Sequence, residues 1–137
     1  MRFFFDGTVV RSQLEPRPEY AGWPEMWNLG LVIAGAVETC GWAALEFMGP
    51  NRPTGKTSLE FLGPIRLSVP LLFEARKSPE GDPSSVECRV LQKGECVTRL
   101  SIPLIPLSPE EARTVMSAVK DFPAALRAGF EARAREA

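Results

Sequence analysis

The feature that most constrains this chain is a long apolar segment at residues 29–47 that carries a charge, Glu38, at its centre. A charge in the middle of a bilayer costs about 2.5–3.5 kcal/mol on insertion scales, and small residues dominate the segment. We therefore expect a core helix and not a membrane span. The helix should begin near Asn28 or Leu29 and run to about Met48, because Gly49 and Pro50 stop it.

This segment has no polar face, so all sides of the helix must be shielded from water. Leu31, Val32 and Ile33 already point in three directions around the axis. A helix that is apolar all round must be buried on most sides. Because Ala34, Gly35 and their neighbours add little side-chain bulk, other backbone can approach closely. A sheet that curls around the helix satisfies both demands.

Strand-like alternation replaces the helical pattern after residue 55. Apolar residues then recur at every second position, the period of a half-buried strand. The alternating runs lie at residues 58–61, 69–76, 86–91 and 96–102, with an earlier strand around residues 8–10. The segment Lys93-Gly94-Glu95 predicts a tight hairpin between the last two runs.

A second helical region is expected at the C-terminus. The run Ser108-Pro109-Glu110-Glu111 is a capping box with proline at the first helical position. Pro123 should break that helix, and a short arginine-rich helix should follow. The 137 residues fit one α+β domain, with its main part at 1–107 and a helical extension at 108–137 packed on it.

The composition excludes several kinds of chemistry. The chain has no histidine, which removes Ser-His-Asp and Cys-His catalysis and the usual catalytic zinc sites. A net charge of −1 gives no footprint for nucleic acid, and we expect no metal or cofactor. Cys40, Cys88 and Cys96 lack metal or redox spacing, which suggests inert thiols in a reducing compartment. With no secretory signal visible at the first residues, we expect a cytoplasmic protein.

The run from Gly22 to Gly30, Gly-Trp-Pro-Glu-Met-Trp-Asn-Leu-Gly, resembles a loop of hotdog-fold thioesterases. In the branch typified by phenylacetate-degradation thioesterases, this loop ends in His-Gly-Gly and opens into the central helix. The resemblance continues through Gly41-Trp42, Thr57 and Pro64-Ile65-Arg66-Leu67, and covers about residues 7 to 103. It implies a hotdog fold, an antiparallel sheet wrapped around one long buried helix. It also implies a homodimer or homotetramer that binds acyl-CoA at a subunit interface.

The resemblance assigns roles to particular residues, with departures. It implies that the N–H of Gly30 holds the thioester carbonyl, a task suited to a helix N-terminus. Asn28 replaces the family's histidine, Leu29 its first glycine, and Val37 its usual acid. Glu38 follows at once but is rotated by about 100°. The catalytic candidates are Glu38, Gly30 and Asn28, and the candidates for substrate binding are Trp27, Leu29, Val37, Trp42, Thr57 and Arg66.

Each candidate also has a structural interpretation. Glu38 is either a general base of raised pKa or a carboxylate at a helix edge or dimer interface. Asn28 either orients the substrate or caps the helix. The tryptophans either line an acyl pocket or pack in the core. Arg66 either contacts CoA phosphates or is a solvated surface charge. The same two alternatives apply to Arg52 and Lys56.

Two functions remain open at this point. The first is an acyl-CoA thioesterase with a divergent site, acting on a small to medium acyl group. The second is a non-catalytic hotdog module that binds acyl-CoA or serves a structural role in an oligomer. The absence of the family's acid at Val37 favours the second. A hotdog dehydratase is more remote, because such enzymes use a histidine.

Overall fold

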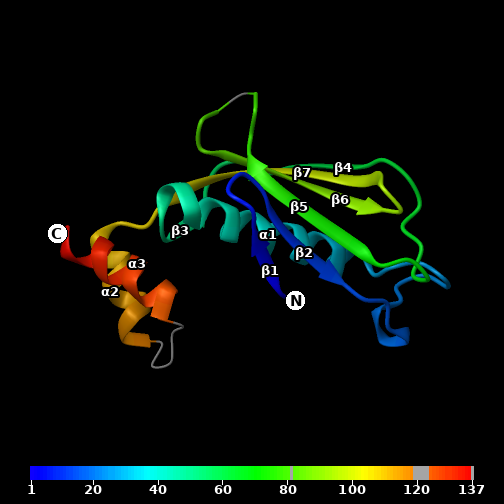
Figure 1. Cartoon of the computed structure of the whole chain (residues 1–137), viewed down its shortest axis with the longest axis horizontal. Helices are drawn as coiled ribbons and strands as arrows, with labels where there is room; N and C mark the ends of the chain where they lie inside the picture. The colour runs from blue at the N-terminus through cyan, green and yellow to red at the C-terminus, as the bar shows by residue number, and fades with distance from the viewer. Residues whose placement is uncertain (81, 119–123, 137) are drawn as a thin grey trace.

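The computed structural model describes residues 1–80, 82–118 and 124–136 of the chain. A seven-stranded antiparallel sheet curves around one long helix, α1 (Leu29–Met48) (Figure 1). The strands are β1 (Phe3–Phe5), β2 (Val10–Leu14), β3 (Asn51–Pro53), β4 (Ser58–Phe61), β5 (Leu71–Lys77), β6 (Ser85–Gln92) and β7 (Glu95–Pro106). Their order is β1-β2-β5-β6-β7-β3, and β4 also pairs with β7. This is the hotdog fold expected from the sequence.

Both ends of α1 are closed by an asparagine. At the start, the side chain of Asn28 accepts a hydrogen bond from the N–H of Gly30 at 2.8 Å. At the end, Gly49 leaves the helical conformation with φ of 76°, which suits glycine. The Asn51 side chain then donates to the carbonyl oxygens of Gly41 and Gly49. The Asn28 cap satisfies an N–H that the helix start leaves without a partner, and the Asn51 side chain ties β3 to the end of α1.

The core lies between α1 and the concave face of the sheet. Leu71, Phe73 and Ala75 alternate inward along β5 and are fully buried. The ring of Phe73 presses on α1 at Gly35, where an added Cβ would lie only 2.5 Å from the ring carbon Cζ. Glycine at this position therefore allows the helix to lie close to the sheet, as the small residues suggested.

The sheet leaves one stripe of α1 uncovered. Val32, Ala36 and Cys40 are completely buried, whereas Gly30, Ala34 and Glu38 are exposed. Residues four apart share a helix face, so the exposed positions form a continuous stripe. The helix is covered on most sides, as expected, but this one stripe stays open in the single chain because the described residues put no strand on it.

Among the described residues, α1 alone has the length and apolar composition of a membrane span. Its contacts with β5, β6 and β7 are those of a core helix. The hydroxyl of Thr39, for example, bonds Ser12 of β2 at 3.0 Å and the carbonyl oxygen of Gly35 at 2.7 Å. Thr39 is thus a packed and satisfied residue.

The later strands match the sequence patterns closely. The alternation at residues 58–61, 69–76, 86–91 and 96–102 corresponds to β4, β5, β6 and β7. Lys93 and Gly94 both have positive φ, 50° and 82°, as a two-residue hairpin turn requires. The first predicted strand is displaced, because β2 runs from Val10 to Leu14 and residues 6–9 form a turn.

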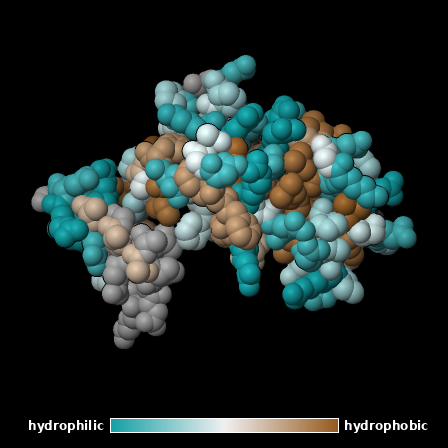
Figure 2. Space-filling view, viewed as in Figure 1, coloured by the Kyte–Doolittle hydropathy of each residue, from teal (hydrophilic) through white to brown (hydrophobic). Residues whose placement is uncertain are grey.

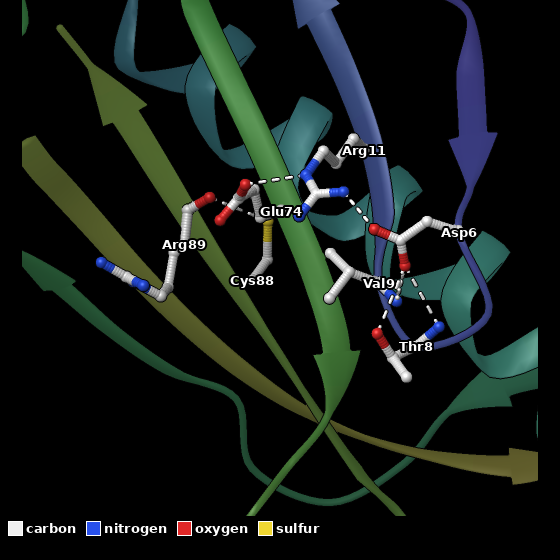
Figure 3. Close-up of polar contacts among 7 residues, drawn as sticks. All are labelled: Asp6, Thr8, Val9, Arg11, Glu74, Cys88 and Arg89. Atoms are coloured by element: carbon white, nitrogen blue, oxygen red, sulfur yellow. Dashed lines mark hydrogen bonds and ion pairs between the residues drawn. The ribbon is translucent and has the colours of Figure 1, made fainter. Parts of the chain in front are cut away.

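An unpredicted strand, β1, precedes that turn and pairs with β2. Asp6 holds the turn by accepting hydrogen bonds from the backbone N–H groups of Thr8 and Val9 (Figure 3). Arg11 links Asp6 to Glu74 on β5. The backbone N–H of Val9, with Arg11, lowers the pKa of Asp6 to about 2.

The C-terminal helices are α2 (Pro109–Ala118) and α3 (Ala124–Arg135). The capping box is confirmed, since Ser108 and Glu111 exchange bonds between side chain and backbone at 2.8 and 3.1 Å. Arg52 of β3 pairs with Glu111 at 2.7 Å, and Arg133 donates to the carbonyl oxygen of Leu107. The predicted break at Pro123 falls outside the described residues. Figure 1 shows the two helices beside the end of α1 that leads into β3.

The three cysteines are unpaired. Cys40 and Cys88 are buried where α1 meets β6, and Cys96 is half-buried. The neighbouring thiol of Cys88, together with burial, raises the pKa of Cys40 well above its usual value. A thiol that resists ionisation is a poor nucleophile, which fits a packing role for Cys40.

Candidate functional site

The N-terminus of α1 is held in place by the loop before it. Trp27 and Asn28 donate their backbone N–H groups to the carbonyl oxygens of Ile65 and Tyr20, at 3.0 and 2.8 Å. Glu25, in the same loop, has a positive φ of 63°. Its carbonyl oxygen accepts from Leu67 at 2.9 Å, so this uncommon conformation is fixed by the facing loop. The start of α1 is therefore a rigid, exposed site.

At this site the Asn28 side chain occupies the N–H group that was predicted to hold a substrate carbonyl. Gly30 N–H, the donor implied by the resemblance, already bonds the Asn28 side chain. Leu29 N–H, one residue earlier, has no acceptor among the described residues. A thioester oxygen would therefore meet Leu29 N–H directly and would reach Gly30 N–H only when the Asn28 side chain turns away. The first N–H groups of a helix are suited to a developing negative charge.

Trp27 is a core residue in this structure. Its side chain is 1% exposed, and its indole N–H donates to the carbonyl oxygen of Val69 at 3.0 Å. Tyr20 stacks on it with ring centres 5.7 Å apart. Trp27 thus positions the loop, while Leu29, two residues later, is 42% exposed.

A hollow of about 340 Å³ lies along the uncovered stripe of α1. Val37, Glu38 and Trp42 line it, so the structure brings these three candidates together. Its other walls are mostly apolar, from β3 and β7, and include Asn51 and Phe130. The ring of Trp42 also stacks on Phe3 of β1 at 5.2 Å. The arrangement places a carboxylate at the edge of a mostly apolar hollow.

The two predicted reactive groups are far apart within one chain. Gly30 and Glu38 are eight residues apart on α1, which at 1.5 Å per residue separates them by about 12 Å along the axis. A catalytic carboxylate must come within about 3 Å of the proton it removes. One copy of α1 cannot therefore bring its own N-terminus and its own Glu38 to the same carbonyl group.

The remaining candidates lie elsewhere. Thr57 is exposed between β3 and β4 and does not line the hollow beside Glu38. Arg66 lines a second hollow of about 490 Å³ with Arg17 and Glu25, next to the loop before α1. Arg52 is paired with Glu111, so it is not a free cation. Within the described ranges, no group of three or more acidic, cysteine or histidine residues gathers as a metal site.

Several large apolar side chains are exposed on the described surface. Brown, apolar areas break through the polar surface over the sheet and helix in Figure 2. Leu59 and Phe61 of β4 point to the concave side yet are 37% and 47% exposed. Trp23, in the loop before α1, is 78% exposed. Such surface in a folded domain typically marks an interaction site.

No family model and no curated protein matches this chain in sequence. Solved structures do match its fold. The TT0310 protein of Thermus thermophilus has a TM-score of 0.66 at 13% identity over 77% of this chain and 91% of its own. An acyl-CoA hydrolase of Staphylococcus aureus, solved with CoA and butyryl-CoA, has a TM-score of 0.66 at 20% identity. The match covers 75% of this chain and 65% of that enzyme.

A third structure is smu.793 of Streptococcus mutans, bound to acetyl-CoA. It has a TM-score of 0.65 at 14% identity over 77% of this chain and 88% of its own. At these identities the matches show the fold alone, a hotdog fold that other matched proteins, described as thioesterases, share.

Two features of the site have no clear signal in the sequence. The open Leu29 N–H follows from the exact pairing of Asn28 with Gly30, although asparagine before a helix does indicate a cap. Phe130 lies more than ninety residues after Glu38 and reaches the same hollow only through the path of α3. Periodicity within a helix does not reveal such a contact.

Proposed function

We propose that this protein is an acyl-CoA thioesterase whose reactive groups come from two copies of the chain. The observation that carries the proposal is the uncovered stripe of α1. It bears exposed N–H groups at its start and Glu38 beside an apolar hollow two turns later. The stripe lies on a fold whose matches include proteins bound to CoA and acetyl-CoA.

An antiparallel pair of α1 helices removes the 12 Å separation. If the two-fold axis passes at Ala34, midway between Gly30 and Glu38, the N-terminus of each helix faces Glu38 of the other. Ala34 is exposed and small, so two such helices can approach closely there. Each dimer would then hold two equivalent sites. The exposed apolar residues Leu59 and Phe61 on β4 offer further surface to the same partner.

In this arrangement the thioester carbonyl oxygen accepts from the N-terminus of one α1, with Leu29 N–H open and Gly30 N–H released by Asn28. Glu38 of the other chain removes a proton from water, which attacks the carbonyl carbon and expels CoA thiolate. Val37 and Trp42 contact the acyl chain. We infer that the protein works in the cytoplasm, where its three free thiols persist.

A specific observation favours the second function, binding without hydrolysis. Gly30 N–H is occupied by the cap, and the position of the family's acid is taken by Val37. A module with these properties would hold acyl-CoA in the same hollow and leave the thioester intact.

Release of free CoA from acyl-CoAs distinguishes the two functions. In the thioesterase, Glu38→Gln lowers kcat by about 10²–10⁴-fold, the usual contribution of a general base. The acyl-CoA affinity should stay similar, since glutamine keeps the size of the side chain. Binding without CoA release in both proteins would establish the module instead.

A mixture of two inactive variants tests whether the site is shared. Leu29→Pro removes the open N–H at the first helical position, where proline is favoured, and Asn28 already has the extended conformation that a following proline needs. Leu29→Ala is the control that keeps the N–H. Mixing Leu29→Pro with Glu38→Gln should restore activity through heterodimers with one intact site. Failure to restore it would rule out a site that combines the α1 N-terminus of one chain with Glu38 of the other, and Leu29→Pro as active as Leu29→Ala would leave Gly30 N–H as the donor.

A further inference from the structure

The C-terminal helix α3 reaches the hollow that the proposed function assigns to the acyl chain. Phe130 of α3 is half-buried and lines this hollow together with Val37, Glu38 and Trp42 of α1. The wall it forms comes from outside the sheet and the central helix. The hollow is thus bounded by α1, by β3 and β7, and by α3.

The contacts of α2 and α3 hold this wall against the rest of the domain. Arg133, three residues after Phe130 and one turn further along α3, donates to the carbonyl oxygen of Leu107 at 2.6 Å. Arg52 of β3 pairs with Glu111 of α2 at 2.7 Å. Leu107 in turn donates its N–H to the carbonyl oxygen of Pro50, which also lines the hollow. Phe130 is therefore anchored from both helices.

The matched structures leave part of this chain without a counterpart. TT0310 and smu.793 are matched over most of their own length but over only 77% of this chain. About a quarter of the chain is left without a counterpart, which is the size of residues 108–137. If the unmatched part is this C-terminal segment, a wall built by α3 is a feature of this chain that those structures lack.

We propose that Phe130 is a specificity-determining residue that limits the length of the acyl chain. This inference rests on the proposed function, since it takes the hollow beside Glu38 as the acyl site. The hollow, at about 340 Å³, is near the small end of ligand pockets, which span about 300–1,000 Å³. With the Phe130 ring closing one side, it holds a short acyl chain.

The experiment compares Phe130→Ala, Phe130→Trp and the unchanged protein with acyl-CoAs from acetyl to palmitoyl. Removing the ring should move the optimum for binding and CoA release to longer chains, with about fourfold tighter binding for each further methylene that becomes buried. The larger indole of Phe130→Trp should move the optimum to shorter chains. Phe47→Ala is the matched control, because Phe47 is exposed on α1 and does not line this hollow.

A probe without CoA separates this inference from the proposed function. Straight-chain alcohols from butanol to decanol are titrated, and the methyl NMR signals of Val37 and Leu45 report on the hollow. If Phe130→Ala accepts longer alcohols than the unchanged protein, Phe130 closes the hollow. This holds even if no CoA ester binds, in which case only the proposed function fails. An unchanged limit for alcohols and CoA esters in both Phe130 variants would overturn the inference and leave thioesterase activity standing.

Discussion

The two faces of α1 are both rich in small residues, yet they differ in what the small residues do. On the covered face, Gly35 lies against Phe73 so closely that a Cβ would be 2.5 Å from the ring. On the uncovered face, a Cβ at Gly41 would meet nothing within 4 Å. One glycine is required by packing in the single chain and the other is not. The comparison indicates that the second face is shaped for something the single chain lacks, a second copy in our proposal.

The strongest test of this difference is a charge on the uncovered face. Ala34→Arg should leave folding intact, because Ala34 is exposed. At the proposed two-fold axis, however, the two arginines would face each other, and like charges brought together at an interface cost several kcal/mol. We expect self-association to weaken by about 100-fold or more, and CoA release to fall with it. Sedimentation of the variant and the unchanged protein measures the association.

The control for that variant is Arg113→Ala, which changes the net charge by one unit in the opposite direction on exposed α2, away from α1. Its association should equal that of the unchanged protein. An Ala34→Arg variant that associates normally would mean that copies meet elsewhere, and the shared site would have to be abandoned.

The next test exchanges glycine for alanine on each face. Gly35→Ala forces a methyl group against the buried Phe73 ring, and overpacking of this kind costs about 1–3 kcal/mol. Gly41→Ala should instead gain up to about 1 kcal/mol, since alanine is the better helix former and has space. Urea unfolding measures both, in the Ala34→Arg background so that a second copy has no influence. Equal effects at the two positions would contradict the difference between the faces.

The sequence predicted elements that depend on neighbours along the chain. The extent of α1 followed from Asn28 and from Gly49-Pro50, and the hairpin turn followed from Lys93-Gly94. Two short strands were missed. The three phenylalanines of β1 show no alternation, and β3 contains Pro53, a residue that argues against a strand.

Contacts across the fold were harder to predict. Trp27 was expected either to bind substrate or to pack in the core, and the sequence could not decide because the hydrogen bond to Val69 that buries it joins segments 42 residues apart. The open stripe on α1 was not foreseen either, because composition shows that a helix needs cover but not whether its own sheet provides it. Glu38, singled out in the sequence as the one charged group between Glu25 and Glu46, is exposed at the edge of a hollow with mostly apolar walls.

A smaller effect is expected from the cap at the start of the uncovered stripe. Asn28→Ala should lower the free energy of unfolding by about 1 kcal/mol, the usual value of such a cap. It also frees Gly30 N–H. If that N–H holds the thioester carbonyl, kcat should rise or stay the same despite the lost stability. If the Asn28 amide itself orients the substrate, kcat should fall. Asn28→Ser is the control, because the serine side chain can still cap the helix and so still occupies Gly30 N–H.

The smallest effect is expected at Glu111. This residue attaches α2 to β3, and α2 packs against α3, which carries Phe130. The backbone N–H of Ser108, with a further contribution from Arg52, lowers the pKa of Glu111 below its usual 4.5. A carboxylate with a lowered pKa stabilises the fold above its ordinary pKa, and this contribution is lost as pH falls below about 4.5. The Ser108 amide should therefore lose protection from exchange in that range. Glutamine can also complete a capping box, so Glu111→Gln should keep the cap and lose the pH dependence. An unchanged pH dependence in that variant would show that another group controls how the C-terminal helices attach beside α1.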